Sequence, residues 1–217
     1  MSNKVDLALA AFQRGEFVVV ADDAGRENEG DLIIAAEFAT PKALSFMLRH
    51  TSGLVCVGMA SERLDALELP LMVPENTESQ RTAFTVSVDF RHGLTTGISA
   101  TERATTIQAL SDPTFTSSDF VRPGHVFPLR ANRRGVLGRR GHTEAAVDLA
   151  RLAGLSPAGA LCEIVDENGE MVRGVGLERF AREHGFHHLT IEEIVIHRRY
   201  DVPSEPRKRP GVQLQNS

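Results

Sequence analysis

Two hydrophobic periods run along the chain, one typical of helices and one typical of strands. Apolar residues recur at helical spacing from Val5 to Phe12 and Gly15 follows them, which predicts a helix over 4–14. Short apolar runs such as FVVVAD and alternating runs such as FTVSVDF predict strands. The predicted helices are 4–14, 41–50, 102–110, 176–183, 190–199 and a segment that follows Thr143 and ends at Gly154; the predicted strands are 17–22, 32–37, 54–59, 84–90 and an extended stretch over 125–131.

Capping and turn residues mark the ends of several of these elements. Thr40 directly precedes a proline, which is a typical helix start, and Thr101 is the predicted cap of the helix over 102–110. A capping box begins at Thr190. The turn sequence Glu167-Asn168-Gly169 predicts a hairpin of two strands.

Helices and strands are mixed without strict alternation, which favours an α+β domain over a doubly wound sheet. The chain has 217 residues, enough for one well-packed domain, and residues 1–200 contain neither an internal repeat nor a linker. We therefore predict a single α+β domain over residues 1–200. The stretch over 201–217 is proline-rich and polar, and we predict a disordered tail there.

Composition narrows the function classes. The formal net charge of -5 argues against a nucleic-acid-binding protein, which is usually basic. Neither Cys56 nor Cys162 belongs to a C-x-x-C pair, so we expect no zinc site and free thiols in a reducing cytoplasm. The N-terminal residues carry charges throughout, so we expect neither a signal peptide nor a membrane span.

An unusual acidic segment, DDAGRENEGD, follows the first predicted strand. Five acidic residues and one arginine lie between Asp22 and Asp31, and such carboxylates repel one another unless a cation lies among them. Magnesium prefers hard oxygen ligands, so it is one candidate. In an extended segment Glu27, Glu29 and Asp31 would point the same way. A solvated acidic turn is the commoner explanation of such a cluster, since charge runs usually face water, and the order of an EF-hand loop is absent.

A basic segment, GRRGHTEAA, leads into the helix that follows Thr143. Arg139, Arg140 and Gly141 come just before a helix N-terminus, where free backbone N–H groups favour an anion such as one phosphate. A basic surface turn is the alternative. His142 is either an exposed histidine near the cap or a ligand to the cation of the acidic segment, and spacing alone does not decide.

Other candidates stand alone in the sequence. His125 lies in a Pro-Gly turn, Glu163 lies in an apolar strand where alternation favours a solvent-facing side chain, and Cys56 is by default a small buried residue. The stretch TTGISATERATT, which contains Thr96, supplies either a second anion site or a helix cap.

Six segments in this order resemble the 3,4-dihydroxy-2-butanone 4-phosphate synthase family of riboflavin biosynthesis. They are DDAGRENEGDLI, RHTSGLVCV, TAFTVSVD, TTGISATERATT, RPGHVFPLRA and GHTEAAVDLARLAGLSPAGALCEI, and the match spans roughly residues 4–198. The combination of R-E-N-E-G-D with a distant G-H-T-E is much more specific than either motif alone.

The resemblance implies an α+β sandwich of a mixed sheet and helices, a homodimer and active sites at the subunit interface. It implies conversion of D-ribulose 5-phosphate to L-3,4-dihydroxy-2-butanone 4-phosphate and formate. Magnesium or manganese is required in this family, and whether one or two ions bind at each site stays open.

The family's site residues carry over by motif. The metal ligands fall on Glu27 and His142, and the residues treated as essential for chemistry fall on His125 and Glu163. The substrate contacts and other site-lining positions fall on Arg26, Asp31, Arg139, Arg140, Gly141, His142 and Thr143, with Asp22, Glu29, Cys56 and Thr96 in less defined roles. We expect Glu29 or Asp31 to begin enolisation of the substrate, with His125 and Glu163 in later proton transfers.

The chain departs from the family pattern at three places. The family often has an acidic residue where Gly25 stands, a smaller residue where Arg140 stands, and a glycine before Thr82 where this chain has Arg81. These departures bear on substrate preference. Two alternatives therefore stay open: another metal-dependent sugar-phosphate lyase or isomerase with the same site, or a non-catalytic phospholigand-binding module.

Overall fold

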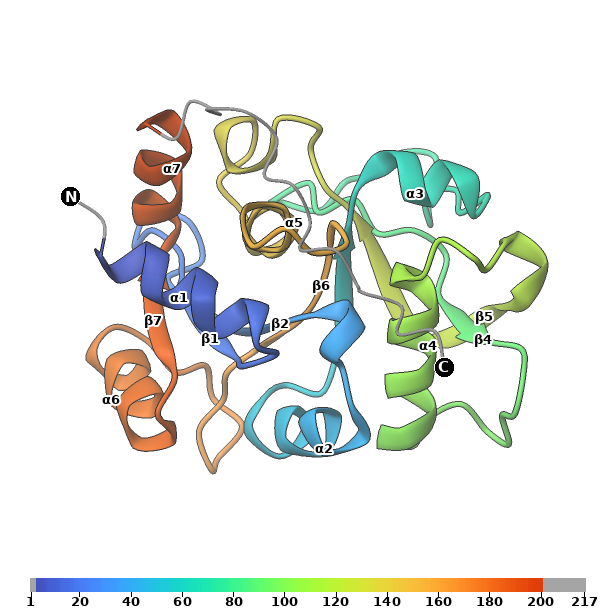
Figure 1. The fold of residues 1–217 in the computed structure, drawn as a ribbon, viewed down its shortest axis with the longest axis horizontal. Coiled ribbons are helices and arrows are strands. Elements are labelled where there is room, and N and C mark those ends of the chain that lie inside the picture. The colour runs from blue at the N-terminus through green and yellow to red at the C-terminus, as the bar shows by residue number, and fades with distance from the viewer. Residues whose placement is uncertain (1–2, 201–217) are drawn as a thin grey trace, which may run out of the picture.

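The computed structural model describes residues 3–200, which form one mixed β-sheet covered by helices on both faces (Figure 1). The sheet has seven strands in the order β4-β5-β3-β6-β2-β1-β7 among the described residues. Strand pairs β1–β7 and β3–β5 are parallel, and the other neighbouring pairs are antiparallel. The strands are β1 (Val18–Ala21), β2 (Gly30–Ala35), β3 (Cys56–Met59), β4 (Val88–Phe90), β5 (Phe120–Arg130), β6 (Ala158–Glu163) and β7 (His187–Thr190). The predicted single α+β domain is confirmed.

Two apolar cores separate the sheet from its two helical layers. In Figure 1, α1, α5 and α7 lie on one side of the sheet, and α2, α4 and α6 lie on the other. The helices are α1 (Asn3–Gln13), α2 (Pro41–His50), α3 (Ser61–Ala66), α4 (Ala100–Ser111), α5 (His142–Leu152), α6 (Val175–His184) and α7 (Ile191–Tyr200). No helix in residues 3–200 has both the length and the apolar character needed to cross a bilayer.

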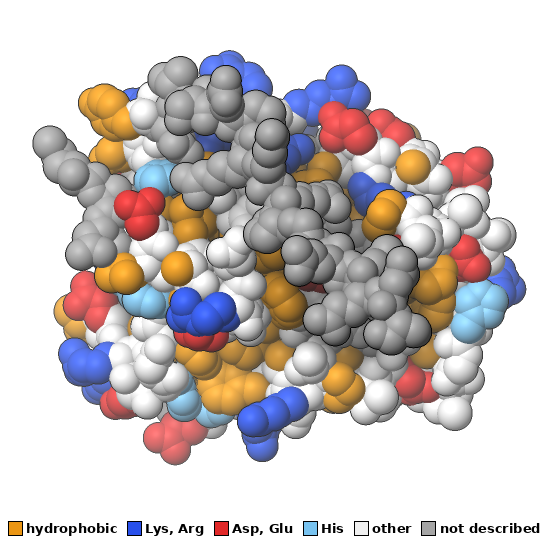
Figure 2. Space-filling model, in the orientation of Figure 1, with side chains coloured by type: hydrophobic (Ala, Val, Ile, Leu, Met, Phe, Trp, Pro, Cys, Tyr) orange, Lys and Arg blue, Asp and Glu red, His pale blue; other side chains and the backbone are white. Residues whose placement is uncertain are grey.

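Positive and negative side chains are interspersed over the visible part of one face of the molecule (Figure 2). Orange apolar side chains lie between them in small groups, as on most protein surfaces.

Local signals in the sequence account for most element boundaries. The Thr40 hydroxyl accepts a hydrogen bond from the backbone N–H of Ala43, so the predicted cap of α2 is confirmed. The capping box at the start of α7 is confirmed as well, because the Thr190 N–H donates to Glu193 and the Glu193 N–H donates to Thr190 Oγ1. The helix α4 is capped by Ser99 rather than by Thr101, because the Ser99 side chain accepts from the Glu102 N–H. The prediction of Thr101 as the cap is therefore wrong.

Two predicted strand pairings are much less extensive in the structure. Of 84–90 only Val88–Phe90 forms a ladder with β5, because Pro128 on β5 has no N–H to donate and leaves Phe84 in an isolated bridge to Leu129. The hairpin after β6 pairs only through Val165 and Met171, since its second arm turns at Gly174 into α6. Neither α3 nor β7 was predicted, as both are short and lack a sustained period.

The tail predicted over 201–217 lies outside the described residues.

Strand register sets the residues that meet at the centre of the sheet. Asp31 of β2 pairs with Glu163 of β6, and Leu161 of β6 pairs with Cys56 of β3. Because side chains alternate along a strand, Glu163 and Leu161 lie on one face, and their partners lie on the same face. This face carries α5, so the row of side chains lies beneath the helix whose N-terminus holds His142.

Two paired glycines bring α5 close to the sheet. Gly58 of β3 lies opposite Gly159 of β6, and a Cβ on Gly58 would lie 2.7 Å from the carbonyl oxygen of Thr143. The first turn of α5 therefore rests directly on the strand backbone. Its position relative to the acidic segment depends on the absence of a side chain at Gly58.

We expect Gly58→Ala to lower the free energy of unfolding by about 1–3 kcal/mol, because the added methyl group meets backbone that must move. The measurement is urea unfolding followed by circular dichroism. Gly25→Ala is the control, since no heavy atom lies within 4 Å of a Cβ at that position. An equal loss of stability in the two variants would contradict the assigned role of Gly58.

Candidate active site

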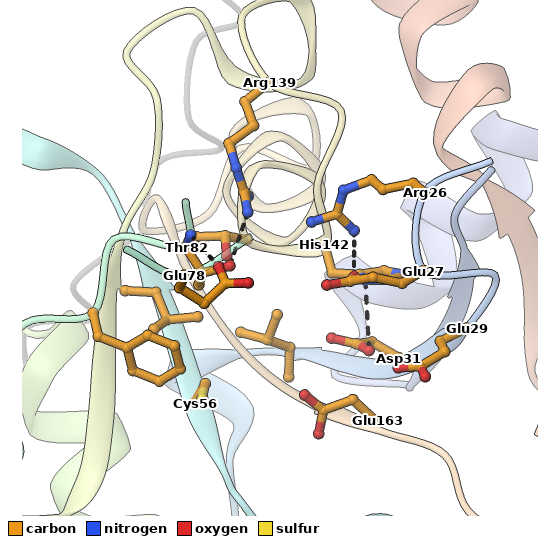
Figure 3. Close-up of a pocket in the computed structure, with 14 residues that line it drawn as sticks. Arg26, Glu27, Glu29, Asp31, Cys56, Glu78, Thr82, Arg139, His142 and Glu163 are labelled. Carbon is orange, nitrogen blue, oxygen red and sulfur yellow. Dashed lines mark hydrogen bonds and ion pairs between the residues drawn. The ribbon is translucent and has the colours of Figure 1, made fainter. Parts of the chain in front are cut away.

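One cavity gathers residues from the acidic segment, from the ends of neighbouring strands and from the N-terminus of α5 (Figure 3). Its lining includes five carboxylates and two guanidinium groups among the described residues, so its charge favours a cation. The lining residues are Arg26, Glu27, Glu29, Asp31, Cys56, Glu78, Thr82, Phe84, Leu129, Arg139, His142, Thr143, Leu161 and Glu163.

The Asp22 carboxylate organises the acidic segment into a turn. One of its oxygens accepts from the backbone N–H of Glu29 at 2.8 Å, and the other accepts from the backbone N–H of Glu27 at 3.0 Å. The second oxygen also accepts from Arg26 Nη1 at 3.0 Å. The segment is therefore a closed turn, with Asn28 at a positive φ of 56°.

This turn brings Glu27 to His142 in the first turn of α5. Glu27 Oε2 lies 3.8 Å from His142 Nδ1, and it also contacts the Arg26 guanidinium. His142 is buried, and burial lowers its pKa to about 4, although the Asp22 carboxylate acts in the opposite sense. The imidazole is consequently neutral at pH 7, which is the form that binds metals.

The residues present fit a divalent cation. Asp22, Glu27 and His142 each offer one ligand atom, and these three atoms lie within 4.8 Å of one another. Ligands about 2.1 Å from one Mg²⁺ ion can be separated by at most about twice that distance, and the 3.8 Å between Glu27 and His142 meets this limit. In addition, Asp31 Oδ1 is buried, lies 3.7 Å from His142 Nδ1 and has no hydrogen-bond partner.

Asp31 and Glu163 face each other across two central strands. Burial raises the pKa of Asp31 well above its usual range, and the nearby carboxylates of Glu163 and Glu27 raise it further. Burial also raises the pKa of Glu29, although Arg173, which contacts it at 3.0 Å, acts against this shift. Carboxyl groups with raised pKa values in a cavity are suited to proton transfer near neutral pH.

Glu163 lines the cavity wall. Its alternation in the strand had suggested a solvent-facing side chain instead. The Ser52 hydroxyl donates to Glu163 Oε2 at 2.6 Å, and the backbone N–H of Ser52 donates to the Glu163 carbonyl at 2.8 Å. These two bonds fix the Glu163 side chain beside Asp31. Cys56 lies in the same row, where burial raises the pKa of its thiol, so it is a neutral neighbour.

The positive side of the cavity is built from Arg139 and the N-terminus of α5. Arg139 donates to Glu144 Oε2 at 2.7 Å and to Thr82 Oγ1 at 2.9 Å, which fixes its guanidinium between the helix and the loop over 76–82. Gly141 is the N-cap of α5, and no side chain caps the helix. The backbone N–H groups of the first turn are therefore left for an anion.

Glu78 organises the loop over 76–82. Although partial burial acts to raise its pKa, hydrogen bonds from the backbone of Gln80 and Thr82 and from the Ser79 hydroxyl lower it to about 2. Arg81 stands at a positive φ of 56°, and its guanidinium donates to the Asn76 carbonyl at 2.6 Å. The loop therefore accommodates an arginine where the family often has a glycine.

Five of the predicted site residues are not among those that line this cavity: Asp22, which organises the acidic turn, Gly141, which is the N-cap of α5, and Arg140, His125 and Thr96. The Arg140 guanidinium contacts Asp23 at 3.1 Å and also Glu192 of α7, so it joins the acidic segment to that helix. His125 lies on β5 and Thr96 lies in the loop before α4, and neither lines the cavity. The His125 side chain instead contacts Asp89 of β4.

Sequence reasoning missed several residues that build the site. Asp22 received only a lining role, but it is one of the three candidate ligands; its place in the same acidic cluster was the available signal. Ser52 occurs in the RHTSGLVCV motif, yet nothing in the sequence shows that it contacts Glu163, because that contact depends on strand register. Glu78 and Asp89 gave no signal beyond their charge.

The mixed sheet and the cation-favouring cavity define a metal-dependent enzyme of small-molecule metabolism. Residues 6–197 match the family model described as 3,4-dihydroxy-2-butanone 4-phosphate synthase. The chain is 55% identical over 202 residues to the 3,4-dihydroxy-2-butanone 4-phosphate synthase of Agrobacterium fabrum, covering 93% of this chain and 95% of that protein. It is 53% identical to the riboflavin biosynthesis protein RibBA of Salinispora arenicola, but covers only 46% of that longer protein.

Solved structures give the same result. A crystal structure of 3,4-dihydroxy-2-butanone 4-phosphate synthase in complex with two magnesium ions matches with a TM-score of 0.86 and 48% identity, over 90% of this chain and 96% of that one. A cation-free form matches with a TM-score of 0.85 and 47% identity, over 92% of this chain and 98% of that one. The chain belongs to the 3,4-dihydroxy-2-butanone 4-phosphate synthase family.

We expect Asp31→Asn to stabilise the metal-free protein at pH 8. The folded-state pKa of Asp31 is raised above its unfolded value, so ionisation costs more in the folded state than in the unfolded state; this penalty on folding grows from the unfolded pKa upward and is complete above the folded pKa. The amide removes it. The melting temperature should rise by about 2–4 °C, the shift that roughly 1 kcal/mol produces in a chain of this size.

The measurement is calorimetry with EDTA present between pH 5 and pH 8, and the gain should shrink toward pH 5. Glu62→Gln, which removes an exposed carboxylate, controls for the loss of one charge. A variant less stable than the parent at every pH would show that Asp31 is not a strained carboxylate.

Proposed function

We propose that this chain converts D-ribulose 5-phosphate to L-3,4-dihydroxy-2-butanone 4-phosphate and formate, supplying the four-carbon unit of riboflavin. The observation that carries the proposal is the convergence of Glu27 and His142, 115 positions apart in the sequence, beside the Asp31–Glu163 pair. Family membership supports the reaction, and the cavity supplies a group for each part of it.

Glu27 and His142, with Asp22 beside them, would hold magnesium or manganese. A structural neighbour of this chain binds two magnesium ions, which supports magnesium here. A divalent cation, when bound, supplies Lewis-acid stabilisation of the negative charge that develops next to the substrate carbonyl. The remaining steps fall to side chains of the protein.

We assign the first proton abstraction to Asp31. Its raised pKa makes it a stronger base than an ordinary carboxylate, and its unpaired Oδ1 is free to accept the proton. Glu29 is the alternative base, but its ion pair with Arg173 directs it away from this role. Glu163, held by Ser52, is placed for a later proton transfer.

Arg139 and the open N-terminus of α5 would bind the substrate phosphate. The Arg139 guanidinium is fixed by Glu144 and Thr82, so it binds with little loss of side-chain entropy. Thr143 lies in the same helical turn and lines the cavity. Anchoring the phosphate at this end orients a flexible ketose toward Asp31 and Glu163.

We propose a homodimer in which His125 and Thr96 of one subunit complete the cavity of the other. His125 lies four residues before Leu129 on β5, so about 13 Å of strand separates it from the cavity wall of its own chain. Leu71, Met72 and Val73 lie beside the loop over 76–82 and are 44–46% exposed. These three side chains form an apolar surface for a second subunit.

The two free cysteines support a cytoplasmic location for this chain.

Formate release tests the reaction. With ribulose 5-phosphate and Mg²⁺, proton NMR should show formate and a four-carbon product, and EDTA should abolish both because Glu27 and His142 lose their cation. Arg14→Ala, which removes a surface ion pair with Glu16, serves as the active control. A carbon-conserving product would instead support an isomerase or aldolase sharing the site, and binding without turnover would support a phospholigand-binding module.

A hybrid dimer tests the shared site. Glu27→Gln and His125→Ala should each be inactive alone, because each removes one half of every site. A purified heterodimer of the two variants keeps one complete site if Glu27 and His125 come from different subunits, so it should regain about half of the wild-type activity. An inactive heterodimer would show that each chain supplies both residues to its own site.

A further inference from the structure

Asp89 of β4 and His125 of β5 form a hydrogen-bonded pair. The Asp89 carboxylate accepts two hydrogen bonds from the same residue: its Oδ1 accepts from the His125 backbone N–H at 2.9 Å, and its Oδ2 lies 2.7 Å from His125 Nδ1. Asp89 is 4% exposed, whereas the His125 side chain is 42% exposed. One end of the imidazole is therefore buried against a carboxylate and the rest of the ring faces outward.

This geometry selects one form of the neutral imidazole. An ionised carboxylate can only accept hydrogen bonds, so the hydrogen must reside on Nδ1. In the neutral ring Nε2 then carries the lone pair, and Nε2 is the atom left for a reacting group. The hydrogen bond from the His125 backbone N–H to Asp89 Oδ1 restricts rotation of the carboxylate, because it fixes the carboxylate plane relative to the strand that carries the ring.

The loop before α4 closes over this pair. Gly97 has a φ of +86°, and a Cβ there would lie 2.2 Å from Asp89 Oδ2 and 2.8 Å from His125 Nδ1. Glu102 of α4 holds the loop in place by accepting from the Gly97 N–H at 3.2 Å and from the Ser99 hydroxyl at 2.9 Å. Asp89 Oδ2 and His125 Nδ1 therefore lie directly against the backbone of this loop.

We propose that Asp89 is a positioning residue of the reaction, which fixes the Nδ1-protonated form of His125 and presents Nε2 as the proton acceptor. The proposal rests on the proposed function, in which His125 completes the cavity, and on the expectation that His125 transfers protons there during turnover. It predicts that the identity of the atom facing Nδ1, and not merely the packing of β4 on β5, determines the rate.

A second histidine–aspartate pair on the same part of the fold provides a matched control. His92 Nε2 lies 2.9 Å from Asp119 Oδ1, but the His92 side chain is 59% exposed and its contact is through the other ring nitrogen. Asp119 also accepts from the Thr116 N–H, so it has its own structural role. The variant Asp119→Asn therefore changes a comparable histidine–aspartate contact without touching His125.

Asp89→Asn is the decisive variant. The amide oxygen can still accept from the His125 backbone N–H, but the amide NH₂ group would donate to Nδ1 and move the ring hydrogen to Nε2. We expect kcat for formate release to fall by about 100-fold or more, the usual contribution of a general base, with KM changed by less than about threefold. Asp119→Asn should retain the wild-type kcat.

Nitrogen-15 NMR of histidine-labelled protein reads the tautomer independently of activity. At a pH where the ring is neutral, His125 in the wild type should show a protonated Nδ1 and an unprotonated Nε2, and Asp89→Asn should show the reverse. A His125→Ala spectrum assigns the signals. Full kcat in Asp89→Asn, or an unchanged tautomer, would overturn the proposal.

A glycine pair in the loop gives a second test that leaves the charges of Asp89 and His125 intact. Gly97→Ala places a methyl group against both residues, while Gly93→Ala adds the same backbone strain at a φ of +75° with no heavy atom within 4 Å. We expect a loss of kcat of about tenfold or more in Gly97→Ala alone, as expected for a displaced catalytic group. Equal rates in the two variants would overturn the proposal even if Asp89→Asn does not fold.

The two proposals fail in different ways. If the wild type releases no formate, the proposed function fails, and the NMR spectra still decide whether Asp89 selects the tautomer. If the wild type is active and Asp89→Asn is equally active, only the positioning role fails.

Discussion

Asp31 and Glu163 are cross-strand neighbours on a buried face of the sheet. The repulsion between their carboxylates is the constraint to which the surrounding charged groups respond. Folding brings these carboxylates together with Glu27 and Glu29 in one cavity, and like charges placed opposite each other on a sheet are destabilising. Protons can relieve part of this repulsion, as the raised pKa of Asp31 shows, and positive charge can relieve more. The Asp22 turn, Arg26 and the candidate cation site all act on the same excess of negative charge. A structural penalty and a catalytic capacity therefore have one physical origin.

The placement of α5 is the second condition for this chemistry. Its N-terminus brings His142 to the carboxylates and directs free backbone N–H groups toward the same cavity. This approach is possible because Gly58 and Gly159 present bare backbone beneath the helix. The candidate cation ligand His142 and the uncapped backbone N–H groups consequently belong to the same first turn of α5, which suits a small substrate that carries both a carbonyl and a phosphate.

Local residue patterns predicted much of the fold and part of the site. The apolar periods identified the central strands and most helices, since burial of one face requires them. The acidic and basic segments marked a cation site and an anion site separately, and only the family resemblance implied that Glu27 and His142 act together. What local pattern could not provide was register. The Ser52–Glu163 bond, the Asp31–Glu163 pairing and the Asp89–His125 contact join segments 36 or more residues apart, and no short-range signal encodes such distances. The role of Asp22 was missed for a different reason, because a turn held by one carboxylate resembles an extended acidic run when it is read as sequence alone.

His125 is held rigidly at a distance from the cavity of its own chain. Leu129 of β5 borders the cavity, while His125 lies farther along the same strand and is fixed by Asp89 and the loop that contains Gly97. A residue held this firmly cannot swing about 13 Å toward its own cavity, because the strand backbone and the carboxylate restrict it together. Rigid placement away from the chain's own carboxylates makes sense if the ring serves a cavity on another subunit. The same rigidity then has a catalytic purpose, since a base delivered across an interface has to arrive with its lone pair already oriented.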